Sequence, residues 1–292
     1  MNWLKSLKGD VKFKESLSKY TTFKIGGKVD LFVEPYNLDE LIFIIREAKV
    51  DNLPLRIIGR GSNLLINDSG LKGIVIRLNS PYFKRIERID SLVKVGAGVS
   101  LERLLNYTCK EGLGGAEFLV GIPASLGGAI IMNAGTDESS LERILEEVVV
   151  IDYNGKIKRF KNKDIRFGYR FCSLYPYIIV EATLKFVPTE SEEILKKRNS
   201  YLAYRRTTQE LNYPSAGCIF KNPKVIPAGK LIDLCGLKGK RIGDAQVSFK
   251  HANFIINKGR ATFKDVLRLI DYIKKKVKSI FNIELEPEIK IW

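Results

Sequence analysis

The chain has 292 residues, 45% hydrophobic and 10% aromatic, which is ordinary for a globular protein of about two domains. Its net charge is +16, but the basic residues are spread along the chain, so the sequence gives little support to a nucleic-acid-binding protein. Four scattered cysteines and a single histidine argue against a disulfide framework and against a metal site. Because the chain has neither a long apolar run nor a secretory signal, we expect a cytoplasmic protein without a membrane span.

Helix and strand patterns alternate through the first half of the chain. Asn37 and Glu40 form a capping pair immediately before an apolar run, which predicts the start of a helix. The expected elements are helices over residues 37–48 and 100–113 and strands over residues 55–58, 73–78 and 91–95. This order is typical of α/β or α+β proteins.

The middle of the chain predicts antiparallel strands and then a change of domain. Asn154-Gly155 between two strand-like stretches, 148–151 and 156–160, is a strong hairpin signal. Alternation from Val180 to Phe186 predicts a half-buried strand. The polar stretch 188–193 is the best candidate for a domain boundary, and a basic helix begins there.

The last segment predicts a helix and a strand. Thr262 and Asp265 cap an amphipathic helix. Its apolar stripe is Phe263, Val266, Leu267, Ile270, Ile273, Val277 and Phe281. Alternation then predicts a final strand, with one face made by Ile283, Leu285, Pro287, Ile289 and Ile291. The other face carries Glu284, Glu286, Glu288 and Lys290.

Two glycine-rich stretches, Gly59 to Asn63 and Gly121 to Gly135, carry the strongest functional signal. Glycine permits positive φ and close approach of a ligand to the main chain, and successive N–H groups in such turns bind phosphate oxygens. Neither stretch fits a Rossmann or P-loop fingerprint, and two purely structural turns are the alternative. Both stretches contain additional side-chain donors: Ser62, Asn63, Ser125 and Asn133. Together they favour a pyrophosphate-bearing ligand.

Five further segments occur in order with these loops: Tyr20–Gly27 (YTTFKIGG), Phe167–Arg170 (FGYR), Tyr213–Pro223 (YPSAGCIFKNP), Lys250–Phe254 (KHANF) and Glu286–Glu288 (EPE). With them the chain resembles the UDP-N-acetylenolpyruvoylglucosamine reductase (MurB) family from about residue 20 to its end. Each motif alone is weak, whereas the ordered set is specific. The short path from Tyr169 to Val180 leaves no room for a substrate-gating loop insertion, so the chain is similar to the shorter type of the family.

The resemblance implies an α+β fold, with a two-subdomain FAD-binding module of the vanillyl-alcohol-oxidase/PCMH type followed by a smaller α+β substrate-binding domain. We expect these parts over residues 1–80, 81–190 and 191–292. The implied activity is the NADPH-dependent, FAD-mediated reduction of UDP-N-acetylglucosamine enolpyruvate to UDP-N-acetylmuramate in peptidoglycan precursor synthesis. We expect a monomer whose FAD is noncovalent, because the single histidine lies far outside the FAD loops.

The resemblance assigns three catalytic residues. Arg170 would stabilise the negative charge that builds on the pyruvyl carboxylate, because a guanidinium binds a carboxylate with two hydrogen bonds and keeps its charge. Without the motif, a surface salt bridge would be the simpler interpretation of this arginine. Glu288 would orient or polarise the same region, but Glu286 has the same place in the alternation, so periodicity does not choose between them.

Cys218 is the main departure from the family pattern, because most of the family has a proton-donating serine at this position. A thiol has a reference pKa of ~8.5 and is a far better acid than a serine hydroxyl. We expect the positive charges of Lys221 and Arg170 to favour the thiolate. The alternative is an inert cysteine in a chain that has lost activity.

The remaining contacts also follow from the resemblance. FAD would be bound by Thr22, Gly26, Gly59, Gly61, Ser62, Asn63, Leu64, Gly121, Pro123, Ser125, Gly127, Gly128 and Asn133. The UDP-sugar would contact Tyr169, Arg206, Lys221 and Asn222, since a diphosphate favours cations and amide donors. The roles of His251 and Asn253 stay open. The rival interpretation is another flavoprotein of the same superfamily, an oxidase or dehydrogenase of a small alcohol, which has no need of the YPSAGCIFKNP or EPE motifs.

Overall fold

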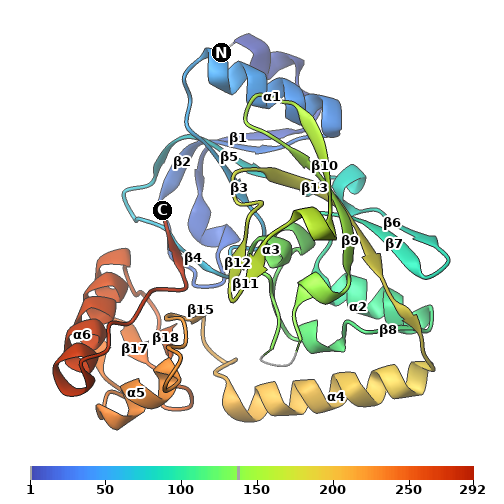
Figure 1. The fold of residues 1–292 in the computed structure, drawn as a ribbon. Coiled ribbons are helices and arrows are strands. Elements are labelled where there is room, and N and C mark those ends of the chain that lie inside the picture. Colours follow the sequence, from blue (N-terminus) through green and yellow to red (C-terminus); the bar gives the residue numbers. More distant parts are fainter. Residues whose placement is uncertain (1, 137–138) are drawn as a thin grey trace. The chain divides into compact units, whose positions relative to one another are not determined.

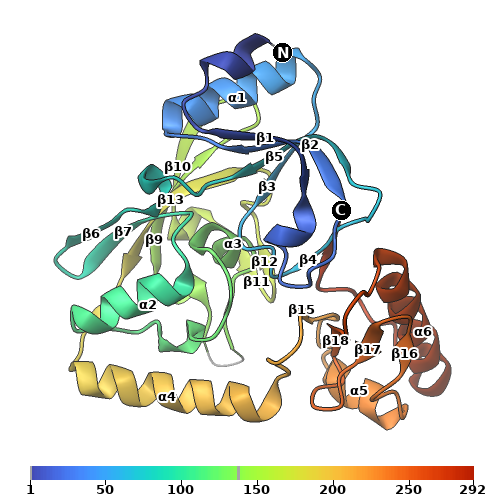
Figure 2. The same ribbon diagram turned by 180° about the vertical axis from the view of Figure 1, so that it is seen from behind.

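The computed structural model describes residues 2–136 and 139–292, and the chain forms two compact units (Figures 1 and 2). Unit 1 consists of Met1–Lys14, Asp30–Arg60 and Lys72–Ala203. Unit 2 consists of Glu15–Val29, Gly61–Leu71 and Tyr204–Trp292. Two short N-terminal segments therefore belong to the same unit as the C-terminal third of the chain.

The first sheet has the order β1-β2-β5-β3, with β3 and β5 parallel. Its strands are β1 (Asp10–Ser16), β2 (Lys28–Glu34), β3 (Leu55–Ile58) and β5 (Leu71–Arg77). The predicted helix is α1 (Leu38–Val50), and the Asn37 side chain accepts a hydrogen bond from the Glu40 N–H at 3.0 Å. The Glu40 carboxylate accepts from the N–H groups of Tyr36 and Gly9, so it fastens the preceding chain to the helix start.

The second sheet of unit 1 is antiparallel throughout, with the order β10-β9-β13-β7-β6. Its strands are β6 (Ile86–Ile89), β7 (Leu92–Gly96), β9 (Leu145–Ile151), β10 (Ile157–Lys161) and β13 (Ile178–Lys185). The predicted hairpin pairs Ile157 with Ile151 across the Asn154-Gly155 turn. Along β13, Val180, Ala182 and Leu184 are buried, which confirms the predicted alternation.

Unit 1 is completed by α2 (Leu101–Lys110), α3 (Leu126–Ile131) and two small strand pairs. The pairs are β8 (Leu113–Gly114) with β14 (Val187–Pro188), and β11 (Phe167–Gly168) with β12 (Phe171–Cys172). One hydrophobic core joins both large sheets, from Leu31 to Phe186. The two sheets fall on either side of residue 80, and the division into parts 1–80, 81–190 and 191–292 stays a prediction about subdomains.

The helix expected after the polar stretch 188–193 is α4 (Ser191–Thr208), and the change of unit falls inside it, between Ala203 and Tyr204. All of its residues are described, and Ile194 is its one buried side chain. Short 3-10 helices cover Asn2–Ser6, Leu17–Tyr20, Pro81–Lys84, Glu117–Leu119, Leu141–Arg143 and Asn162–Asp164. Within the described ranges, no helix has the length and apolar character that crossing a membrane requires.

Unit 2 contains an antiparallel sheet of order β15-β18-β17-β16 and two helices. The strands are β15 (Ser215–Cys218), β16 (Arg241–Ile242), β17 (Ala245–Val247) and β18 (Phe254–Asn257), and the helices are α5 (Ala228–Leu234) and α6 (Phe263–Phe281). The capping box of Thr262 and Asp265 is confirmed. The helix buries Leu269, whereas Leu267 of the predicted stripe is only half-buried.

The prediction of a continuous final strand is wrong. The regular part is β19 (Lys290–Ile291), which pairs in parallel with β4 (Leu64–Leu65). Before it, Pro287 forms an isolated bridge with Phe220, and Ile291 is 45% exposed although the alternation placed it on the buried face. The residues of this stretch pair with two different segments, at Leu64 and at Phe220, so the alternating sequence pattern does not correspond to one regular strand.

Candidate functional site

The two glycine-rich loops meet within unit 1. A Cβ atom on Gly59 would lie 2.4 Å from the Ser125 hydroxyl oxygen, so the main chain of the first loop is packed directly against the second. Ser125 is itself buried and forms a bridge with Ser100, the residue that caps α2. Glycine at position 59 thus allows two segments more than sixty residues apart to approach closely.

Some N–H groups of the second loop are used inside the protein. The Leu126 N–H donates to the Val99 carbonyl at 2.8 Å, and the Gly127 N–H donates to the Ala97 carbonyl at 2.9 Å. A Cβ atom on Gly127 would lie 3.1 Å from the Ala97 side chain. The close packing against Ala97 therefore explains why glycine stands at position 127. Gly121, Pro123 and Gly128, in contrast, are exposed.

A cluster of cations lies beside these loops, and the sequence interpretation missed it. Burial, followed by the positive charge of Arg77, lowers the pKa of Lys84, and the charges of Arg103 and Arg60 act in the same direction. Arg60 lies inside the first glycine-rich loop, and Arg103 is in the first turn of α2 after Ser100. Glu34 pairs with Arg77 at 3.4 Å and offsets part of the charge. The surroundings suit a phosphate-bearing cofactor.

Asn133 is 5% exposed, and its amide is engaged in unit 1. Its Nδ2 donates to Glu142 at 2.9 Å and to the Gly168 carbonyl at 3.2 Å, and its Oδ1 accepts from the Glu142 N–H. The side chain thus connects the second glycine-rich loop to the FGYR hairpin. Through these bonds Asn133 positions neighbouring segments, and its assignment as a direct cofactor ligand stays a prediction.

Tyr169 and Arg170 form the two-residue turn between β11 and β12, because Gly168 pairs with Phe171. Arg170 has a φ of +55°, the left-handed region that side chains other than glycine rarely adopt. Its guanidinium lies 5.2 Å from the ring centre of Tyr169, and its Nη1 is 3.5 Å from the Gly135 carbonyl oxygen. Tyr169 is 50% exposed, whereas Arg170 is half-buried.

The predicted motifs of unit 2 are joined by hydrogen bonds. Thr22 donates from its hydroxyl to the Ser215 carbonyl at 2.7 Å, which links YTTFKIGG to YPSAGC. The Thr22 N–H donates to the Gly61 carbonyl at 3.3 Å. Gly61 has a φ of +61° and is buried, and Gly26 has a φ of +144° beside Ile66. The first glycine-rich loop thus continues into unit 2 from Gly61 onward.

Asn63 is held against the C-terminal segment. Its Nδ2 donates to the Glu288 carbonyl at 3.2 Å, and its own carbonyl accepts from the Lys290 N–H at 2.9 Å. Ser62 and Leu64 on either side are half-buried, and Leu64 begins β4 beside β19. A residue of the cofactor loop and the predicted catalytic glutamate are therefore fastened together in one unit.

Cys218 ends β15 and is half-buried. The next residue, Ile219, accepts a hydrogen bond through its carbonyl from the Glu288 N–H at 2.8 Å, and Phe220 bridges Pro287. Cys218 and Glu288 therefore lie on adjacent segments of unit 2. Arg170, the third predicted catalytic residue, belongs to unit 1.

The structure separates the two carboxylates that periodicity left equivalent. Glu286 pairs with Lys221, with 2.5 Å between Oε1 and Nζ, and its side chain is 69% exposed. Glu288 is half-buried and is tied through its main chain to Ile219 and Asn63. The Lys221–Glu286 pair also shows that this predicted substrate-binding lysine has a protein partner.

The other two predicted substrate contacts of unit 2 lie at its surface. Asn222 is exposed, and its Oδ1 accepts from the Ala228 N–H at 3.1 Å at the start of α5. Arg206 is exposed near the end of α4, and its carbonyl accepts a hydrogen bond from Lys250 Nζ. Their roles toward a UDP-sugar stay predictions.

The KHANF motif has a structural explanation that sequence reasoning left open. Asn253 is 1% exposed and binds both main-chain polar groups of Phe220. His251 accepts from the Asn253 N–H through Nδ1 at 3.2 Å and packs against Phe254. Burial lowers the pKa of His251, which favours the neutral imidazole that this hydrogen bond requires.

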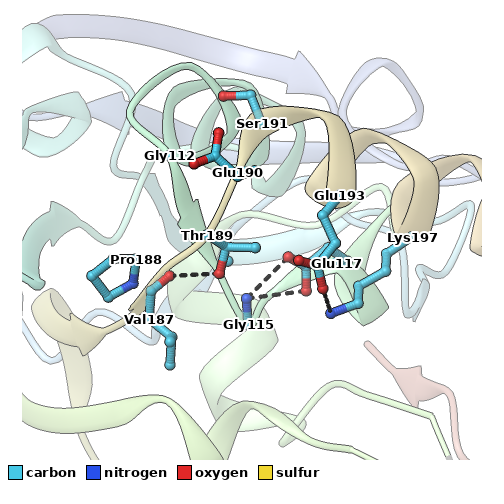
Figure 3. Close-up of a pocket in the computed structure, with 11 residues that line it drawn as sticks. Gly112, Gly115, Glu117, Val187, Pro188, Thr189, Glu190, Ser191, Glu193 and Lys197 are labelled. Carbon is cyan, nitrogen blue, oxygen red and sulfur yellow. Dashed lines mark hydrogen bonds and ion pairs between the residues drawn. The ribbon is translucent and has the colours of Figure 1, made fainter.

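A surface cavity of about 820 Å³ in unit 1 has the wrong charge for a pyrophosphate (Figure 3). It lies beside β8, β14 and the start of α4, and carboxylates line it. Glu117 accepts from the Gly115 N–H with both oxygens, and Glu193 pairs with Lys197 at 2.7 Å. Its lining contains none of the predicted site residues. In the described part of the chain, no group of His, Cys, Asp and Glu side chains is arranged to hold a metal ion.

Two family models match separate parts of this chain. Residues 29–161 match the FAD binding domain family, and residues 209–292 match the C-terminal domain of UDP-N-acetylenolpyruvoylglucosamine reductase. The UDP-N-acetylenolpyruvoylglucosamine reductase of Anoxybacillus flavithermus is 43% identical over 97% of this chain and 94% of its own length. That of Moorella thermoacetica is 42% identical over 98% of this chain and 94% of its own.

Solved structures show the same likeness. The crystal structure of UDP-N-acetylenolpyruvylglucosamine reductase (MurB) from Thermus caldophilus is 36% identical with a TM-score of 0.83, over 98% of this chain and 99% of that one. Phl p 4.0202, a glucose dehydrogenase, is 12% identical with a TM-score of 0.50 over 62% of this chain and 42% of its own, which shows a likeness of fold alone.

The fold and the glycine-rich loops define a flavoprotein with an FAD-binding domain, so the predicted α+β architecture and the FAD cofactor are confirmed. Within that class, the chain belongs to the UDP-N-acetylenolpyruvoylglucosamine reductase (MurB) family. The rival interpretation as a small-alcohol oxidase or dehydrogenase is wrong, because the family likeness extends over nearly the whole chain.

Proposed function

We propose that this chain reduces UDP-N-acetylglucosamine enolpyruvate to UDP-N-acetylmuramate with NADPH as the reductant, in peptidoglycan precursor synthesis. The observation that supports it most is the network of unit 2. Asn63 of the cofactor loop binds the Glu288 carbonyl, and the Glu288 N–H binds the residue that follows Cys218. An acid, a carboxylate and a cofactor loop in one fixed network are what a reductive protonation needs.

Bound FAD would take hydride from NADPH and supply it to the methylene carbon of the enol ether. The close approach of Gly59 to Ser125 and the cations near Arg60 fit a cofactor that carries a pyrophosphate. In unit 1 the residues that would hold it are Gly59, Gly121, Pro123, Ser125, Gly127, Gly128 and Asn133. In unit 2 they are Thr22, Gly26, Gly61, Ser62, Asn63 and Leu64.

Cys218 would donate the proton to the α-carbon of the substrate. Its thiol is half-buried at the end of β15, and a thiol gives up a proton more readily than the serine hydroxyl that most of the family carries here. The neighbouring cation in sequence is Lys221, which is paired with Glu286. That pair reduces the positive charge that we expected around the thiol.

Arg170 would bind the pyruvyl carboxylate as negative charge builds on it. The turn between β11 and β12 presents its guanidinium beside Tyr169, which we propose as a contact of the UDP-sugar. Glu288 would orient the reacting group, and Glu286 is set aside because it is highly exposed and paired with Lys221. Arg206, Lys221 and Asn222 would contact the diphosphate, where cations and amides are favoured.

The test is NADPH oxidation by the purified, FAD-loaded protein with and without the enolpyruvyl substrate. We expect NADPH consumption that depends on the substrate and yields UDP-N-acetylmuramate. The flavin should survive dialysis and be released by denaturation, because we expect it to be noncovalent. A yellow protein that oxidises no NADPH in response to this substrate would refute the proposal. Localisation in the cytoplasm and a monomeric state are parts of the same proposal.

A further inference from the structure

We propose that Asn253 is a positioning residue that fixes the segment carrying Cys218 relative to the segment carrying Glu288. The inference rests on the proposed function, because it takes Cys218 as the acid and Glu288 as the orienting carboxylate. It goes beyond that function by giving the KHANF motif a part in the protonation step.

The Asn253 side chain makes a pair of hydrogen bonds to one residue. Its Oδ1 accepts from the Phe220 N–H at 2.9 Å, and its Nδ2 donates to the Phe220 carbonyl at 2.8 Å. The side chain is 1% exposed, so these bonds have little competition from water. Because the two bonds point in opposite senses, they fix both the place and the rotation of this peptide segment.

The main chain of Asn253 adds to this hold. Its carbonyl accepts from the Ile219 N–H at 2.8 Å. From the C-terminal segment, the Glu288 N–H donates to the Ile219 carbonyl at 2.8 Å, and the Lys221 N–H donates to the Glu286 carbonyl at 2.9 Å. Residues 219–221 are therefore bound to Asn253 and also to residues 286–288. A shift at Asn253 changes the placement of Cys218 and of Glu288 together.

The strand ladder alone does not provide this placement. The pairing of β15 with β18 is irregular between Ser215 and Cys218, where Gly217 takes a φ of +74°. A bulge of this kind interrupts the ladder and re-aims the residue beside it. The Asn253 amide supplies hydrogen bonds directly after the interruption.

Asparagine is the side chain that suits this task. Binding the N–H and the carbonyl of one residue needs an acceptor and a donor held a fixed distance apart, which a planar amide offers. An aspartate of the same shape keeps the acceptor, but when ionised it cannot donate to the Phe220 carbonyl. A serine is too short to reach both groups. Asn253→Asp and Asn253→Ser therefore weaken the hold in different ways.

The experiment measures the two half-reactions of the FAD-loaded protein by stopped flow. In both variants we expect flavin reduction by NADPH near the wild-type rate and reoxidation by the enolpyruvyl substrate slowed about 10- to 100-fold, the effect of a misplaced group. Val277→Ala is the control, because Val277 is fully buried on α6 in the same core and belongs to no predicted site. It should lower the melting temperature without slowing reoxidation.

A second measurement does not depend on the substrate. The rate at which iodoacetamide alkylates Cys218, followed by peptide mass spectrometry, should change about 10-fold in the Asn253 variants, since thiol reactivity follows its surroundings. Cys235 is half-buried in the same unit and should react as in the wild type. Val277→Ala should leave both rates unchanged.

The outcomes separate the two proposals. If the wild type does not reoxidise with the enolpyruvyl substrate, the proposed function fails, and the Cys218 alkylation rates still decide whether Asn253 positions the thiol. Unchanged reoxidation in the Asn253 variants would overturn the positioning role. So would equal losses in both half-reactions, or failure of both variants to fold, because Asn253 would then serve stability alone.

Discussion

Replacing Gly61 by alanine should weaken FAD binding more than its backbone conformation alone predicts. Gly61 has a φ of +61°, and a left-handed residue with a side chain costs roughly 1–2 kcal/mol. An added Cβ would lie 2.1 Å from the Tyr20 carbonyl oxygen and 2.8 Å from the Thr21 Cα. Both neighbours are main-chain atoms, so the loop must shift, and such overpacking costs about 1–3 kcal/mol more. We therefore expect the free energy of unfolding to fall by about 2–5 kcal/mol in total.

Gly236→Ala is the matched control in the same unit. Gly236 has a φ of +67°, and apart from its two chain neighbours no described residue has an atom within 4 Å of the position that its Cβ would take. It should therefore lose about 1–2 kcal/mol from the backbone term and keep its FAD. The free energy of unfolding would be followed by the fluorescence of Trp292 in a Trp3→Phe background, since Trp292 belongs to unit 2. Equal losses in the two variants, or full FAD occupancy in Gly61→Ala, would refute the close packing.

Three further predictions concern Arg170, Cys218 and His251. Arg170→Lys should lose roughly 3–4 kcal/mol of transition-state stabilisation, measured as kcat/KM. Arg170→Gly should be inactive but melt at a higher temperature, because it removes a strained φ of +55°. Cys218→Ala should slow flavin reoxidation by the substrate about 10²–10⁴-fold without changing flavin reduction, and Cys218→Ser should recover much of the loss. The pKa of His251 is lowered on folding, so the unfolded state takes up this proton first and stability falls as the pH drops below about 6.5. His251→Asn, which keeps an acceptor near the place of Nδ1, should show a shallower fall in a pH series of melting temperatures, and identical slopes would contradict this.

Elements defined by neighbouring residues could be predicted from the sequence. The cap at Asn37, the hairpin at Asn154-Gly155 and the capping box at Thr262 all depend on contacts within a few residues. The prediction of one continuous final strand was wrong because the partners of this segment, at Leu64 and Phe220, are far away in the chain. Alternation of apolar and polar residues indicates which side chains face a core. It does not indicate whether the segment pairs with one neighbouring strand over its whole length.

The division of the chain into two units could not be predicted from the sequence either, because it also depends on contacts between distant segments. Residues 15–29 and 61–71 join the C-terminal third, and the Thr22–Ser215 and Asn63–Glu288 hydrogen bonds are among the contacts that bind them there. No local pattern marks such a crossing, because each segment begins and ends inside an ordinary connection or strand. The motif order identified the family without this knowledge, since a family is recognised by which residues occur and not by where the chain takes them.

For individual site residues, the structure distinguishes what the motifs treat alike. Gly59 and Gly127 both stand in glycine-rich loops, but Gly127 is packed on Ala97 with its N–H already donated. Asn63 and Asn133 are both potential donors, but Asn63 binds the Glu288 carbonyl in unit 2, whereas Asn133 binds Glu142 and the Gly168 carbonyl in unit 1. A sequence shows the type of polar group at a position, whereas its hydrogen-bond partners depend on packing that only the fold determines.

The positive φ of Arg170 allows a catalytic role of this residue to be tested against a structural one. Arg170 occupies the second position of a two-residue turn at a positive φ, where glycine or asparagine would relieve strain of the order of 1 kcal/mol or more. Its guanidinium lies 5.2 Å from the Tyr169 ring centre, and its Nη1 is 3.5 Å from the Gly135 carbonyl oxygen, so the side chain also has contacts within the folded unit. Replacing Arg170 by glycine relieves the backbone strain and removes these contacts, so a higher melting temperature means that the strain outweighs the contacts. Under the proposed function the guanidinium binds the substrate, so we expect Arg170→Gly to lose activity, and a variant that stays active would refute this role.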